Sequence, residues 1–101
     1  MATIPVHLAN DRYWKPVIHL FQNNSKLQRY FNTKYFNLES GTISSVALKR
    51  KAAPWSSSEK FLLNLALHLY NERNKVNLSD MDYLDDSNKK IALEAISMRF
   101  G

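Results

Sequence analysis

Residues 60–73 carry the clearest helical pattern in the chain. Their polar side chains recur at helical spacing and form one stripe, while apolar residues occupy the rest of the circumference. Ser56 and Glu59 match a capping box, in which the serine hydroxyl accepts from the N3 amide and the glutamate reaches back to the N-cap amide. A helix this apolar must be covered on several sides. We expect residues 60–72 to form the central helix of the fold.

Two further segments have a helical pattern. Ser25 and Gln28 match a second capping box, which predicts a helix over residues 26–36. Its apolar side chains share one face, which favours the core over a ligand platform; they are Leu27, Tyr30, Phe31 and Tyr35. A helix over residues 88–100, capped by Asp86 or Ser87, is apolar around most of its wheel.

The first part of the chain is less regular. Apolar residues alternate over residues 2–9, and Pro5 removes a backbone donor, which together predict an extended arm or an edge strand. A helix follows. Its start is open between a cap at Asn10 or Asp11 and Pro16 as the first helical residue.

Two shorter segments connect these helices. Gly41 lies in a predicted turn, where it can adopt a positive φ. The spacing after it favours a short helix over residues 43–50, although residues 42–48 are also compatible with a strand. Ser79 is the expected N-cap of another short helix that carries Met81.

The predicted fold class is mainly α: a compact helical bundle of four to six helices. A small two-stranded or extended element is compatible with residues 2–9 and 42–48. The chain has 101 residues, of which 45% are hydrophobic and 23% charged. This composition is typical of a soluble globular domain, and the length predicts one domain over residues 1–101.

The sequence contains few of the residues that known catalytic motifs require. The chain has no cysteine and two glycines, which excludes thiolate catalysis, cysteine-based zinc sites, P-loops and Rossmann glycine motifs. His68 and Glu72 share a helix face, but two ligands do not make a metal site. We expect no catalytic, cofactor or metal residues and no enzyme activity. The alternative is a site that the fold assembles from His19, His68, Glu72 and tyrosines.

The sequence predicts a cytoplasmic protein. Its start has no basic segment followed by an apolar stretch of the kind found in secretory signals, and no window of about 18 apolar residues occurs. The absence of cysteine is compatible with a reducing compartment.

Positive charge is concentrated in the first half of the chain. The formal net charge is +5, of which residues 1–58 contribute +6 and residues 59–101 contribute −1. Aromatic residues are interleaved with these cations, a pattern that can hold phosphates and stack on bases. The candidate contacts to a partner or to nucleic acid are Trp14, Lys26, Arg29, Lys34, Tyr35, Lys49, Arg50, Lys51, Trp55 and Arg99.

Arg99 differs from the other candidates because it points into the apolar arc of the last helix. A last-turn arginine can lay its stem on apolar surface and interact with the negative end of the helix. An ion pair across an interface is the alternative.

One part of the chain carries a resemblance. Trp55 and the following serines, the apolar run ending in Leu69-Tyr70-Asn71, and the closing residues 95–100 resemble short uncharacterised proteins of Gram-positive bacteria and their phages or mobile elements. The resemblance covers residues 55–100. It implies a cytoplasmic accessory protein and supplies no activity or functional residues.

Two functions are compatible with these features. The first is a non-enzymatic protein-binding module, a regulator or adaptor with a protein partner or self-association, because both long helices are highly apolar and Trp14 and Trp55 are candidates for exposure. The alternative is nucleic-acid binding through the basic first half. We expect no membrane partner. The structural discriminator between the two functions is whether the basic side chains converge on one face.

Overall fold

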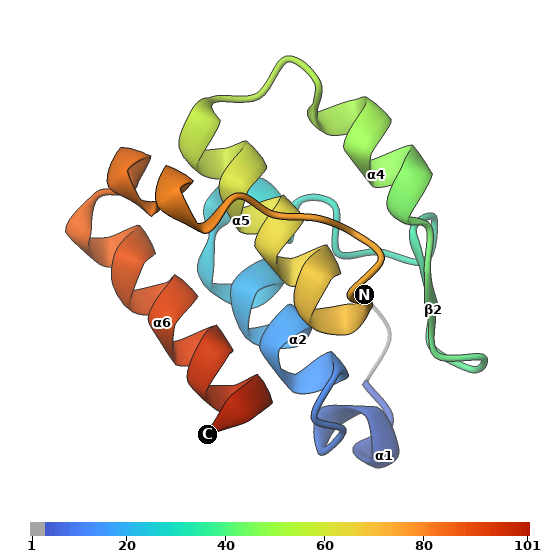
Figure 1. Cartoon of the computed structure of the whole chain (residues 1–101). Helices are drawn as coiled ribbons and strands as arrows, with labels where there is room; N and C mark the ends of the chain where they lie inside the picture. Colours follow the sequence, from blue (N-terminus) through green and yellow to red (C-terminus); the bar gives the residue numbers. More distant parts are fainter. Residues whose placement is uncertain (1–3) are drawn as a thin grey trace.

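The computed structural model describes residues 4–101, which form a mainly helical domain (Figure 1). Two very short strands interrupt the helices. In chain order the elements are α1 (Val6–Ala9), α2 (Trp14–Asn23), α3 (Ser25–Gln28), β1 (Phe36–Asn37), β2 (Thr42–Ile43), α4 (Ser45–Ala52), α5 (Ser57–Tyr70), the 3-10 helix η1 (Leu78–Tyr83) and α6 (Asp86–Phe100). The predicted fold class is confirmed.

The helix α5 is the centre of the fold, as its pattern predicts. It packs against α2, α4, α6 and η1, and seven of its residues are buried. Figure 1 shows α5 between α4 on one side and α2 and α6 on the other. The capping box at its start is present: Ser56 Oγ accepts from the amide of Glu59, and the Glu59 carboxylate accepts from the amide of Ser56.

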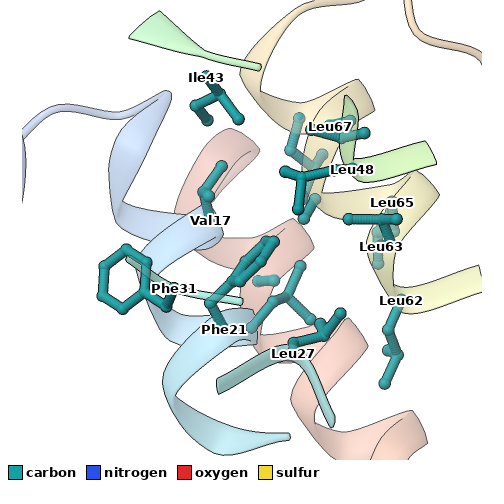
Figure 2. Packing of buried hydrophobic residues seen from close by; sticks show 14 of the residues in the cluster. Val17, Phe21, Leu27, Phe31, Ile43, Leu48, Leu62, Leu63, Leu65 and Leu67 are labelled. Atoms are coloured by element: carbon teal, nitrogen blue, oxygen red, sulfur yellow. The ribbon is translucent and has the colours of Figure 1, made fainter. Parts of the chain in front are cut away.

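The core is built around large apolar side chains from α2, α5 and the segment after α3 (Figure 2). Phe21 meets Phe36 edge to face at 5.0 Å between ring centroids, and Phe31 meets Phe36 in the same way at 4.9 Å. Such pairs place the positive ring edge against the negative face of the partner. Of the apolar residues predicted on one face, Leu27, Phe31 and Tyr35 are buried here and Tyr30 is half-buried.

The predicted helix over residues 26–36 is wrong beyond its first turn. The helix α3 ends at Gln28, and its cap is Asn24, whose side chain accepts from the amides of residues 26 and 27. A chain of turns follows, in which the side chain of Asn32 accepts from the amide of Lys34. Asparagine competes with helical hydrogen bonds in this way. The aromatic side chains therefore reach the core from turns.

The extended element expected at residues 2–9 is also wrong where the structure describes it. Val6–Ala9 is a helical turn, and residues 2 and 3 lie outside the described part. The amides of Leu8 and Ala9 both donate to the carbonyl oxygen of Pro5, whose missing N–H is tolerated at a helix start. The alternation of apolar residues is too short to decide between a strand and a turn of helix.

The segment after Gly41, whose pattern allows a helix or a strand, contains both. Thr42 and Ile43 pair antiparallel with Asn37 and Phe36, and the chain then enters α4. Gly41 closes the turn between the strands with a φ of 69°, which confirms the predicted positive φ.

The start of α2 uses one of its predicted caps, and the starts of η1 and α6 use other residues than predicted. Asp11 accepts from the amides of Tyr13 and Trp14, so the aspartate precedes α2 and Pro16 lies within its first turn. Asn77, rather than Ser79, caps η1, and Asp85 caps α6 by accepting from the amide of residue 88. Asp11 is one of the two predicted caps, whereas Asn77 and Asp85 lie two residues and one residue before the predicted caps.

Candidate nucleic-acid interface

The helix α4 carries the densest basic run of the chain. Leu48 and Ala52 lie on its buried face, and α5 is the helix against which α4 packs. Val46, Arg50 and Ala53 lie on the opposite side at the i, i+4, i+7 spacing of one helix face, and all are exposed. We call these three residues the outer ridge of α4.

A shallow depression lies along one flank of α4. It has a volume of about 420 Å³ and is lined by Lys34, Tyr35, Ala47, Arg50 and Lys51. Lys34 comes from the turns before β1, so the fold brings it beside two cations of α4. No carboxylate lines this depression.

Aromatic rings lie beneath and beside these cations toward α3. Lys34 Nζ lies 5.7 Å from the ring centroid of Tyr35, and Tyr30 lies between Tyr35 at 5.9 Å and Trp55 at 5.1 Å. Lys26 Nζ lies 5.7 Å from the ring centroid of Trp55. Both ammonium groups lie within cation–π range of a ring, an interaction that leaves their charge in place.

The other flank of α4 also carries cations. Lys49 and Lys60 line a second depression of about 250 Å³ with Asn64 from α5. Lys49 Nζ donates to Asn74 Oδ1 at 2.9 Å, which orients the ammonium group without a counter-charge. Cations therefore lie on both sides of the outer ridge.

Ion pairing does not neutralise these cations. Across residues 4–101 the ion pair found is that of His19 and Glu94, with 3.1 Å between Nε2 and Oε1. Every lysine and arginine of the sequence falls in this range, and none has a carboxylate oxygen within 4.0 Å. Lys34, Lys49, Arg50, Lys51 and Lys60, which form the basic face, thus have no ion-pair partner among the described residues, which favours an anionic ligand.

The predicted aromatic contacts do not lie on the surface. Trp14, Tyr35 and Trp55 are 3%, 5% and 8% exposed. The expectation that Trp14 and Trp55 are exposed is therefore wrong, because both rings fill the core: Trp14 packs on Phe36 and Tyr70. These three buried rings are therefore not available to stack on a ligand.

The remaining two candidates lie apart from the depressions. Arg29 is exposed in the turn after α3. Arg99 is half-buried at the end of α6, with its guanidinium carbon 4.3 Å from the ring centroid of Tyr13 and 4.6 Å from that of Phe100. Arg99 thus joins the end of α6 to the residues that precede α2.

Sequence reasoning missed two parts of the basic face. Lys60 lies in the polar stripe of α5, outside the predicted contacts. Tyr30, predicted to lie in the core, is half-buried beside this face. Val46, 71% exposed on the outer ridge, also lies outside the predicted contacts. The sequence does contain a signal for Lys60. Residues 53–56 follow the basic run, and Lys60 lies one helical turn after them.

The fold also assembles part of the alternative polar site. His68, Glu72, Tyr70 and Arg99 line a pocket of about 400 Å³ that Tyr13 and Phe100 complete. His19 lies elsewhere, in the pair with Glu94. His68 Nδ1 is 2.8 Å from the carbonyl oxygen of Asn74, so this nitrogen carries the proton and donates. Within residues 4–101 no group of three or more histidine or acidic side chains is placed to hold a metal ion.

Comparisons with protein-family models, with curated proteins and with solved structures found no match. The resemblance to proteins of Gram-positive bacteria and their mobile elements stays a prediction. Among the helices of the described residues, none is both long and apolar enough to cross a membrane.

Proposed function

We propose that this protein binds nucleic acid through the basic face of α4. The observation that carries the proposal is the convergence of Lys34, Arg50 and Lys51 on one depression that no carboxylate lines. Phosphate contacts supply most of the affinity of sequence-independent binding, because each neutralised phosphate releases counterions. The burial of Trp14, Tyr35 and Trp55 favours contacts to the backbone over stacking on bases.

The test is a titration of fluorescently labelled DNA, duplex and single-stranded, in about 50 mM salt, where electrostatic binding is strong. We expect binding by the parent protein and a large loss in the triple variant Lys49→Ala, Arg50→Ala, Lys51→Ala. The matched control removes the same charge elsewhere: Arg73→Ala, Lys89→Ala, Lys90→Ala. Undetectable binding by the parent, or equal losses in the two triple variants, would contradict the proposal.

A second candidate is the protein-binding module, acting as a regulator or adaptor of a phage or mobile element in the cytoplasm. One observation favours it: Leu93 and Phe100 of α6 are 56% and 66% exposed and lie on the same helix face. Exposed apolar patches often mark interaction surfaces.

Affinity purification with the parent and with Leu93→Ser, Phe100→Ser tests this second candidate. We expect a specific partner, or self-association in sedimentation, that the double variant loses. A strictly monomeric parent that recovers no specific partner would contradict it.

A further inference from the structure

The connection between α4 and α5 determines which helix can enter a groove. Residues 53–56 join the two helices, a length typical of a helix-turn-helix unit. In that motif the second helix usually reads the major groove. Here the second helix is α5, seven of whose residues are buried and whose polar stripe is only half-buried at Asn64 and His68, so α5 is held in the core of the domain. The helix available for a groove is therefore α4.

The helix α4 has the dimensions that a groove requires. An α-helix with its side chains is about 10 to 12 Å across, and the major groove of B-DNA is about 12 Å wide, so a helix such as the eight-residue α4 fits into it. Figure 1 shows α4 at the edge of the molecule, away from α2 and α6. Its outer ridge carries an apolar residue, Val46, and a cation, Arg50, and no acidic residue.

The cations on the two flanks match the two strands that border a groove. Lys34 and Lys51 lie along one flank of α4, and Lys49 and Lys60 lie along the other. A single strand offers one line of phosphates, whereas a duplex groove offers one on each side. Double-stranded RNA does not fit, because its major groove is deep and narrow.

We propose that α4 lies in the major groove of duplex DNA, with its outer ridge toward the base edges. Lys34 and Lys51 contact the phosphates of one strand, and Lys60 contacts those of the other. Arg50 is placed to donate to guanine, and Val46 is placed against a thymine methyl group. This inference rests on the proposed function and specifies its ligand.

The experiment compares the full-length protein on duplex DNA, on duplex RNA of the same sequence and on the single DNA strand. We expect each of the last two to bind about tenfold more weakly or worse. Methylation of the bound duplex by dimethyl sulfate provides a second readout: guanine N7, in the major groove, should be protected, and adenine N3, in the minor groove, should not.

Single variants test the two flanks separately. Lys34→Ala and Lys60→Ala should each reduce the slope of log K against log salt by about 0.9, because each removes one phosphate contact. Lys90→Ala on α6 is the control and should leave the slope unchanged.

The outcomes separate the two proposals. Equal affinity for duplex RNA or for the single strand, protection of adenine N3 alone, or an unchanged slope in Lys60→Ala would overturn the groove geometry and leave nucleic-acid binding in place. Absence of binding to all three nucleic acids would overturn both proposals.

Discussion

Lys34 and Arg50 line the same depression, although one belongs to the turns before β1 and the other to α4. The pairing of β1 with β2 produces this relationship, because it folds the chain back so that α4 starts beside the turns. Two like charges on one surface repel each other unless a ligand of opposite charge lies between them. The fold thus places two cations where both can face one anion.

The central position of α5 predicts a large effect of truncating its buried side chains. Leu65→Ala and Leu69→Ala should each lower the free energy of unfolding by about 2 to 5 kcal/mol, because each leaves a cavity in a packed core. Leu93→Ala, on the exposed side of α6, is the control and should change it little. Denaturant unfolding measures all three. Losses below about 1 kcal/mol in both α5 variants would remove the central-helix assignment.

The capping box at Ser56 has its own contribution. Ser56→Ala should cost about 1 kcal/mol, because the amide of Glu59 loses its acceptor at the helix start. Ser57→Ala, one residue inside the helix, makes the same chemical change without removing a cap. If the two variants have the same Tm in thermal unfolding, the cap does not stabilise α5.

Gly41 allows a test of backbone strain that is free of steric overlap. A Cβ at this position would lie 3.6 Å from Leu8 Cδ2 and 3.8 Å from Trp14 Nε1, which is ordinary contact. The φ of 69° remains unfavourable for an L-residue, so Gly41→Ala should destabilise the protein by about 1 to 2 kcal/mol. Chemical denaturation of this variant and of the exposed control Glu39→Ala measures the loss of stability. An unchanged midpoint would contradict the left-handed turn.

The contact of Arg99 with Tyr13 should be measurable as a coupling energy. A double-mutant cycle with Arg99→Ala and Tyr13→Ala should give about 0.5 to 1 kcal/mol, the range of partly exposed cation–π pairs. The same cycle with Tyr83, an exposed tyrosine of η1, provides the control and should give no coupling. Additive effects for Arg99 and Tyr13 would show that the stacking does not stabilise the fold.

The sequence predicts those parts of the fold that local chemistry determines. Ser56 and Glu59 lie three residues apart, and the apolar positions of α5 are close to one another along the chain, so a pattern detects them. The end of α3 depends on competition between helical hydrogen bonds and the side chain of Asn32, which a helical wheel does not contain. The burial of Trp14 likewise depends on Phe36 and Tyr70, which are distant in sequence.

The basic face likewise has one part that the sequence predicts and another that only the fold creates. The run from Lys49 to Lys51 is visible in the sequence, but a helix distributes its members around the axis, with Lys49 on one flank and Lys51 on the other. Lys34 joins one flank and Lys60 joins the other through tertiary structure, because neither residue belongs to α4. The number of converging cations therefore follows from the fold and not from the run.

The salt dependence of binding to duplex DNA tests the central claim most directly. Three phosphate contacts, from Lys34, Lys51 and Lys60, predict a slope of log K against log salt near about −2.7, measured between about 50 and 200 mM. The triple variant Lys34→Ala, Arg50→Ala, Lys51→Ala should reduce the slope to about −0.9, while Arg73→Ala, Lys89→Ala, Lys90→Ala should leave it at the parent value. A parent slope near zero, or the same slope in all three proteins, would contradict the assignment of the α4 face as the nucleic-acid interface.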